Sequence, residues 1–340
     1  MHTVILEEFG TFLGKKRDRL VVKKDGKTLA EFPVSQVERV IVSSAGASLS
    51  SAALYLAVEN RVPVSFTYSD GTPFGFLTPT EGHGTVLTRR AQYLEAGTEK
   101  ALHLAKGFVT GKLLNQQALL SQWARSRTRT DAESSDKLFE LADRVKVAQT
   151  ELGGIEGPID VRTRDSIMNI EGRAASAYWE GVAAIVPDEF DFSNRNTRSA
   201  KDPFNMMLNY GYGILYSEVW SAVNAGGLDP FAGFLHVDRP GRPSLVLDLI
   251  EEFRQQAVDR VIVRLTTKQV IRAAETAESG ELSKQTRQVL ATEVVGRLSE
   301  QVQVRDSKIE LKNAIVRQAW AVAKFLRGES SRYEPFSLRW

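Results

Sequence analysis

The chain has 340 residues, of which 42% are hydrophobic and 25% are charged, and its formal net charge is +2. These values are typical of a folded globular protein, so they argue against intrinsic disorder and against a collagen-like repeat. The length allows one large core or two domains. The sequence contains no cysteine, which excludes disulfides, thiolate metal sites and a cysteine nucleophile.

The first residues do not resemble a targeting signal. "MHTVILEEFG" carries acids where a secretory signal peptide needs a basic start followed by an apolar run. The sequence also lacks any stretch of about 18 apolar residues, the length that a membrane-spanning helix requires. We therefore expect a cytoplasmic protein that does not associate with a membrane.

Residues 1–80 are predicted to form a small β domain. Short runs rich in Val, Ile, Leu and Phe, such as "TVILEEF", "RLVVKK" and "VPVSFTY", alternate with turn signals at 24–26 and 70–71. One helix is expected within this domain at about 48–60, with Ser48 or Ser50 as its N-cap.

A linker at 81–90 and a helical domain at 91–340 are predicted to follow. "TEGHGT" combines glycine with polar residues, as linkers do. Beyond it, apolar residues recur at steps of three and four, for example at Leu102, Ala105 and Val109, which is the spacing of one helix face. The predicted fold class is α+β, with a small β domain followed by a larger all-α domain.

One carboxylate lies in an unexpected place. In "MNIEGRAASAYWE", Ile170, Ala174 and Ala177 can supply the apolar face of a helix, and Glu171 lies directly beside that face. Burying a charged group is costly unless something compensates it. The sequence therefore raises the question of what compensates Glu171.

A histidine and two further acids form a second candidate group. His236 ends "AGFLH", and Asp248 and Glu251 lie three residues apart in "DLIEEFR", so that a helix would present both carboxylates on one face. A set of Glu, His, Asp and Glu suits a cation such as Mg²⁺ or Mn²⁺, and suits zinc less well because histidines are few. Spacing alone is also compatible with a structural histidine and a solvated helix face.

Positive residues gather in "TRRAQY", "WARSRTRT" and "SNRNTRSAK", a pattern that permits nucleic-acid binding without requiring it. Such side chains either contact phosphate or are simply solvated. Arg254 has two readings, since it can pair with a neighbouring acid or reach a phosphate. The candidate phosphate-binding residues are Arg89, Arg90, Arg195, Arg198, Lys201 and Arg254.

Four segments, in this order, resemble the CRISPR-associated integrase family usually called Cas one: "LTRRAQY", "IMNIEGRAASAYW", "DPFNMMLNYGYGILYSEV" and "GFLHVDRPGRPSLVLDLIEEFR". The similarity covers nearly the whole chain. It implies an N-terminal β-sandwich followed by a helical domain whose metal site is made by one Glu, one His and one acid. It also implies homodimers that assemble with the small Cas two protein.

Carried over to this sequence, the resemblance implies that Glu171, His236 and Glu251 are metal ligands. Asp248 would bind a second ion, hold a water or orient His236. The glycine after Glu171 would leave room for the DNA backbone, and the bound cation would compensate the carboxylate. Residues 1–80 are expected to form the dimer contact, because an isolated β domain would leave strand edges uncovered.

The implied activity is a metal-dependent DNA integrase and endonuclease. It would join short DNA fragments to the CRISPR array by attack of their 3′-hydroxyls on repeat phosphodiesters, with double-stranded DNA as both fragment and target. Two alternatives stay open: a metal-dependent repair nuclease that acts on branched DNA, in which the ion activates water instead, and a non-catalytic DNA-binding scaffold.

Overall fold

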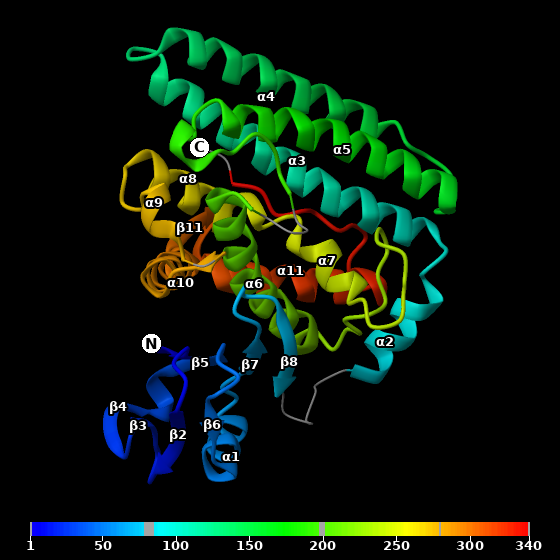
Figure 1. Ribbon diagram of the computed structural model, residues 1–340. Helices are drawn as coiled ribbons and strands as arrows, with labels where there is room; N and C mark the ends of the chain where they lie inside the picture. Colours follow the sequence, from blue (N-terminus) through cyan, green and yellow to red (C-terminus); the bar gives the residue numbers. More distant parts are fainter. Residues whose placement is uncertain (1, 78–84, 197–200, 279, 339–340) are drawn as a thin grey trace.

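The computed structural model describes residues 2–77, 85–196, 201–278 and 280–338, and it divides into a strand-rich part and a mostly helical part (Figure 1). Strands β1 to β8 all lie within the first 77 residues, and the helical part follows. The predicted α+β class is therefore confirmed.

The strand-rich part contains two four-stranded sheets, with strand orders β1-β5-β7-β8 and β4-β3-β2-β6. The strand β1 runs parallel to β5, and β5 runs parallel to β7. Parallel neighbours need a crossover connection, and between β5 and β7 the chain passes through β6 and helix α1. The bounds are β1 (His2–Leu6), β2 (Thr11–Lys16), β3 (Arg19–Lys24), β4 (Lys27–Pro33), η1 (Val34–Gln36), β5 (Val37–Val42), β6 (Ser48–Leu49), α1 (Ser51–Glu59), β7 (Val64–Thr67) and β8 (Pro73–Leu77).

Side chains from both sheets form one core. Leu6, Val40 and Val64 come from one sheet and Leu13 and Leu20 from the other, and all five are buried. Two sheets that share a core in this way form a sandwich-like layer pair. Helix α1 begins as predicted, because the side chain of its N-cap residue Ser50 accepts the backbone N–H of Ala53.

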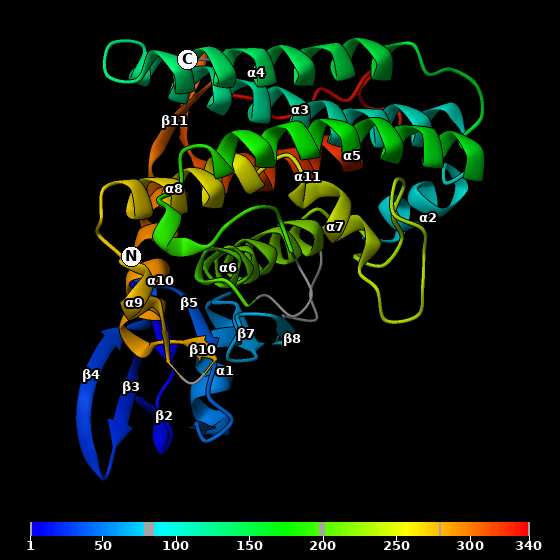
Figure 2. The same cartoon turned by 45° about the horizontal axis from the view of Figure 1, so that its top comes forward.

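The helical part surrounds a central helix, α6, with a layer of three long helices, α3, α4 and α5, on one side (Figure 2). Two short hairpins, β9-β10 and β11-β12, also occur in this part. The bounds are α2 (Thr85–Leu94), α3 (Glu99–Arg127), α4 (Ala132–Gly153), α5 (Val161–Ala183), η2 (Asp188–Phe190), α6 (Pro203–Ala225), α7 (Ser244–Ile250), η3 (Gln255–Asp259), α8 (Arg260–Thr267), α9 (Ala273–Thr276), β9 (Ala277–Glu278), β10 (Glu281–Leu282), α10 (Lys284–Ser299), β11 (Gln301–Val304), β12 (Ser307–Glu310) and α11 (Leu311–Leu326).

The expected linker at 81–90 needs a correction. Residues 85–90 form the first turns of α2, and residues 81–84 lie outside the described part of the chain. The amphipathic spacing of "TVLTRRAQYL" explains this outcome, because it lets α2 bury Thr88 and Gln92 on one side.

The turn between β7 and β8 packs directly against α6. A Cβ atom added to Gly213 of α6 would collide with the backbone of Gly71, so this close approach requires glycine at position 213. Arg39 of β5 adds a buried ion pair with Glu218 of α6. The strand-rich part is therefore fixed to the helix that runs through the centre of the helical part.

Among the described residues, every helix is too short or too polar to cross a lipid bilayer.

Candidate functional site

Asp248 fixes both the backbone and the imidazole of His236. Its carboxylate, fully buried on α7, accepts the backbone N–H groups of Phe234 (2.6 Å), Leu235 (3.0 Å) and His236 (2.9 Å). The imidazole Nδ1 lies 2.7 Å from the Oδ1 atom of Asp248. A carboxylate only accepts hydrogen bonds, so in the neutral imidazole Nδ1 carries the proton and Nε2 keeps a lone pair.

Glycine at position 233 makes this arrangement possible. A Cβ atom there would lie 2.6 Å from the Cβ of Ser244 and 3.0 Å from the Oδ2 atom of Asp248. The first distance is too short for a Cβ atom and the second is tight, so the loop that carries His236 approaches α7 this closely because residue 233 is glycine.

Glu171 and Glu251 converge on the ammonium group of Lys112. Glu171 lies on α5, Lys112 on α3, and Glu251 directly follows α7. Lys112 Nζ forms ion pairs with Glu171 Oε1 and with Glu251 Oε2, the latter at 2.6 Å. Their side chains are mostly buried, with exposed fractions of 13% for Lys112, 22% for Glu171 and 10% for Glu251. A buried cation therefore compensates Glu171, which answers the question that the sequence raised.

The second oxygen of Glu251 pairs with Arg254, whose Nε atom lies 3.0 Å from Oε1. Burial alone would raise the pKa of Glu251, but Arg254 and Lys112 outweigh it and lower the pKa to about 2. The Oε2 atom of Glu251 is buried and, although it is in ion-pair contact with Lys112, it accepts no well-aligned hydrogen bond. Glu251 is thus an ionised carboxylate with one oxygen that is incompletely satisfied.

Arg254 is held on the ring of Tyr212. Its guanidinium carbon lies 4.5 Å from the ring centroid, a cation–π distance. The Tyr212 hydroxyl donates to the buried carboxylate of Asp259 (2.5 Å), which also accepts from Tyr178 (2.9 Å). Burial raises the pKa of Asp259 to about 6 despite these hydrogen bonds. Asp259 lies in η3, a π-helical turn of a kind often found at functional sites.

The C-terminal segment closes over the neighbouring residue, Glu252. Tyr333, Phe336 and Leu338 are buried. The carboxylate of Glu252 accepts the Tyr333 hydroxyl (2.5 Å), the backbone N–H of Phe336 (2.7 Å) and the amide of Gln318 (3.0 Å). Burial raises the pKa of Glu252 to about 8. The C-terminal segment therefore holds the turn that carries Glu251 in place through its contacts with Glu252.

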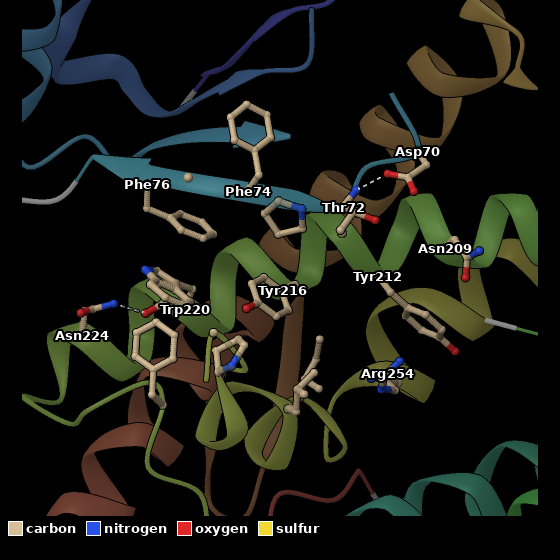
Figure 3. A pocket seen from close by; sticks show the side chains of 18 of the residues that line it. Asp70, Thr72, Phe74, Phe76, Asn209, Tyr212, Tyr216, Trp220, Asn224 and Arg254 are labelled. Carbon is tan, nitrogen blue, oxygen red and sulfur yellow. Dashed lines mark hydrogen bonds between the residues drawn. The ribbon is translucent and has the colours of Figure 1, made fainter. Parts of the chain in front are cut away.

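A cavity of about 670 Å³ adjoins this cluster, between the β7-β8 hairpin, α6 and the residues around α7 (Figure 3). On one side, Phe76 and Trp220 stack at a centroid distance of 4.6 Å with nearly parallel rings, and Tyr216 lies beside them. On the other side it is lined by Arg195 and Arg254. The cavity thus joins an aromatic wall to the guanidinium group that pairs with Glu251.

The predicted phosphate-binding residues have different surroundings. Arg89 and Arg90 are exposed on α2, and Lys201 is exposed just before α6. Helix α2 is docked on the loop that leads to His236, because the Gln92 amide donates to the carbonyls of Asp229 (3.0 Å) and Ala232 (2.7 Å). Two exposed arginines are thus held beside that loop.

The two remaining phosphate-binding candidates, Arg195 and Arg198, lie in the polar sequence segment before α6. Arg195 is not a freely solvated loop residue: it donates to the side-chain oxygens of Asn205 (2.8 Å) and Asn209 (2.6 Å) on α6, and burial lowers its pKa. These partners are brought close only by the tertiary fold, so the sequence could not identify them. Arg198 lies outside the described residues.

The side chains of Glu171, Glu251 and His236 are of the types that bind a divalent cation, but they are not arranged around a common ion position. In the described part of the chain, no group of three or more His, Asp or Glu side chains is arranged to share an ion. The ammonium of Lys112 lies between two of the three predicted ligands, while His236 is held by Asp248 of α7, the helix that Glu251 directly follows. Two carboxylates and a neutral imidazole nitrogen are a suitable donor set for Mg²⁺ or Mn²⁺.

Sequence reasoning missed Lys112, Asp259, and the contact between Glu252 and the C-terminal segment. One signal was present for Lys112. On α3 the apolar stripe that contains Phe108 and Leu119 is interrupted by Lys112, Asn115 and Gln116, and polar residues at core positions need partners elsewhere. The partners of Lys112 and Asn115 lie on α5, after α7 and near the C-terminus, so no local pattern identifies them.

Comparison with known proteins places this chain in a family. The sequence model described as "CRISPR associated protein Cas1" matches residues 4–295. A relative named CRISPR-associated endonuclease Cas1 1, from Archaeoglobus fulgidus, is 37% identical over 99% of both chains. Another relative of the same name, from Pyrobaculum aerophilum, is 38% identical over 98% of this chain and 99% of its own.

Solved structures share the fold at lower identity. A casposase bound to its integration product superposes with a TM-score of 0.83 at 24% identity, covering 98% of this chain and 93% of its own. A chain of a Cas6-RT-Cas1–Cas2 complex gives a TM-score of 0.77 at 20% identity, covering 98% of this chain and 36% of its own. With the full-length match to the curated relatives, these findings show that the chain belongs to the Cas1 family of CRISPR-associated proteins.

Proposed function

We propose that this protein is a metal-dependent DNA endonuclease and integrase of CRISPR adaptation, which inserts short foreign DNA fragments into the CRISPR array. The observation that carries the proposal is the convergence of Glu171 and Glu251, from separate parts of the chain, on a single cation position, with His236 held by Asp248 three residues before Glu251. Full-length similarity to relatives named Cas1 endonucleases supports it.

Glu171, His236 and Glu251 would hold Mg²⁺ or Mn²⁺. When bound there, such an ion would neutralise charge that develops on a phosphodiester and orient the attacking 3′-hydroxyl. His236 would offer Nε2, because Nδ1 is committed to Asp248. Asp248 acts as a positioning residue: its four hydrogen bonds hold the tautomer and the backbone of His236.

DNA would approach through the cavity beside Arg254. Its aromatic wall, with Phe76, Tyr216 and Trp220, suits unpaired bases, since stacking on aromatic rings tolerates any base. Arg89, Arg90 and Lys201 are exposed and would contact phosphates, as would Arg198. Arg195 and Arg254 line the cavity and would meet the backbone of a strand that enters it.

Two protein partners belong to the proposal: a second copy of the chain and the Cas2 protein. Large apolar side chains are exposed on the strand-rich part, among them Phe9 (82%), Leu29 (58%) and Phe74 (60%). Such side chains, together with unpaired strand edges, suit a homodimer formed largely through residues 1–80. Cas2 is supported by family membership and by the complex of the same fold whose name includes it.

A strand-transfer assay tests the function. Labelled duplex fragments, a supercoiled repeat target and Cas2 are incubated with Mg²⁺ or Mn²⁺, and the wild type is compared with Glu171→Ala and Glu251→Ala. We expect joined products that disappear in excess EDTA and in both variants, while DNA binding in a salt series is retained, because phosphate neutralisation supplies most of that affinity.

The other outcomes identify the alternatives. Metal-dependent cutting of branched DNA without joining would indicate a repair nuclease. DNA binding with neither cutting nor joining would indicate a scaffold. If both variants stay folded but lose DNA affinity in proportion to activity, the carboxylates organise the DNA-binding surface instead of the chemistry.

A further inference from the structure

Lys112 is a buried ammonium in the middle of a long helix. It lies on α3 between two buried residues, Gly111 and Leu113, and only 13% of its side chain is exposed. Burying an isolated ammonium costs several kcal/mol, so a lysine is retained at such a position only with compensating charges. The compensating carboxylates are Glu171 and Glu251.

The charges of this cluster balance without a divalent ion. Glu171 and Glu251 carry two negative charges, and the groups that contact them, Lys112 and Arg254, carry two positive charges. Lys112 contacts both carboxylates and Arg254 contacts Glu251, so the four charged groups form one continuous cluster. A divalent cation added to this cluster would leave a local surplus of two positive charges.

We infer that Lys112 is the resident counter-cation of the metal site. In the metal-free protein its ammonium holds Glu171 and Glu251 together, and a divalent cation binds by displacing it. This inference rests on the proposed function, because it takes Glu171 and Glu251 as metal ligands.

The chemistry of lysine suits this role. Its charge lies at the end of a flexible four-carbon stem and its three donors rotate freely, so it can leave two carboxylates without moving the helix. Arg254 differs, since its guanidinium is also held over Tyr212. Lys112, and not Arg254, would therefore be the cation that the metal ion displaces. Because Lys112 competes with the ion for the two carboxylates, it lowers the metal affinity of the DNA-free protein. DNA phosphates, being anionic, would restore that affinity by accepting the surplus charge.

The test measures stability and metal binding of Lys112→Met in the full-length protein, with Mn²⁺ alone as the probe. In EDTA the variant should melt several degrees below wild type, because two buried carboxylates lose their shared cation. Mn²⁺ should restore most of that loss. Titration calorimetry should show Mn²⁺ binding about tenfold tighter than to wild type, a typical size for coupling between two ligands of one site.

Lys106→Met is the matched control. Lys106 lies on the same helix, and its ammonium donates to the carbonyls of Gly153 (2.9 Å) and Ile155 (2.6 Å) instead of carboxylates. Its loss should lower the melting temperature without changing Mn²⁺ affinity. If Lys112→Met binds Mn²⁺ no more tightly than wild type, Lys112 does not compete with the ion and the inference is wrong.

A double-mutant cycle keeps the inference testable if Lys112→Met folds poorly. In a Glu171→Gln background only one carboxylate remains for the ammonium, so removing Lys112 should cost less stability there than in wild type. An equal cost in both backgrounds would contradict the inference. Failure of the proposed function looks different, since wild type itself would then bind no Mn²⁺ and gain no stability from it.

Discussion

The imidazole Nδ1 atom of His236 lies 2.7 Å from the Oδ1 atom of Asp248, and the same carboxylate accepts the backbone N–H groups of residues 234, 235 and 236. One buried acid thus determines where the histidine lies and which of its nitrogens is free. This relationship separates two acids that the sequence presents as a pair: Asp248 faces His236, whereas Glu251 faces Lys112 and Arg254.

Asp248→Asn should weaken metal binding without removing a ligand. An amide cannot accept on both sides, so at least one backbone N–H is left unsatisfied, at a cost of about 1–3 kcal/mol. The His236 tautomer is also no longer fixed, and we expect Mn²⁺ affinity to fall about 10- to 100-fold. Urea denaturation and calorimetry measure the two effects.

Asp238→Asn is the control for that change. Asp238 belongs to the same loop and its Oδ1 atom accepts the N–H of Gly233 at 3.0 Å, but it does not contact the imidazole. Its Mn²⁺ affinity should stay near that of wild type. A folded Asp248→Asn protein with unchanged affinity would show that His236 needs no such support.

Glu252→Gln should alter how stability depends on pH. The pKa of Glu252 is raised to about 8 by burial, so between about 4.5 and 8 the folded protein holds a proton that the unfolded chain releases. Stability from this group is therefore full below pH 4.5 and falls as pH rises towards 8. Glutamine resembles the protonated acid, so the variant should match wild type at pH 5.

At pH 8.5 the same variant should exceed wild type by at least about 1 kcal/mol, since one pKa unit corresponds to about 1.4 kcal/mol. Chemical denaturation at the two pH values measures this difference. If the variant is equally destabilised at pH 5 and pH 8.5, Glu252 is ionised in the folded protein, and the three groups that donate hydrogen bonds to it stabilise its charge.

Trp220→Ala should weaken binding of DNA that carries unpaired 3′ nucleotides. Stacking on an aromatic ring contributes about 1–3 kcal/mol per base, so we expect a loss of about 5- to 100-fold for such ends and little change for blunt duplex. Trp220→Phe should retain most of the affinity. Fluorescence anisotropy with the two DNA types makes the comparison.

Trp320→Ala serves as the control, because Trp320 is 49% exposed on α11 and does not line the cavity. Equal losses for blunt and overhanging DNA after Trp220→Ala would mean that the cavity does not receive unpaired bases.

Much of the fold is predictable from the sequence because its signals are local. The division near residue 80 follows from a change of apolar period, and the start of α1 follows from Ser50 as a cap. The start of α2 could not be separated from a linker, because glycine and charged residues precede a short amphipathic run. The close packing of Gly71 on Gly213 depends on the tertiary fold and leaves no local pattern.

The candidate site divides in the same way. Glu171, His236, Asp248 and Glu251 could be selected because they stand out from their apolar surroundings and match a family motif. The contacts that these residues make could not be predicted from the sequence. The ion pairs of Glu171 and Glu251, for example, depend on Lys112, which is 59 residues from Glu171 in sequence. Arg195 shows the same limit: a polar loop predicts solvation, but the side chains of Asn205 and Asn209 hold the guanidinium against α6.

The central claim is that Glu171, His236 and Glu251 bind a divalent cation, with Nε2 of His236 as the nitrogen ligand. The most direct measurement is pulsed electron paramagnetic resonance of Mn²⁺ bound to wild type and to His236→Gln, with the protein in excess. Wild type should show a nitrogen coupling from a directly bound imidazole, and the variant should lose it while Glu171 and Glu251 still retain Mn²⁺ at reduced affinity. Bound Mn²⁺ without nitrogen coupling in wild type, or the same coupling in His236→Gln, would contradict the account.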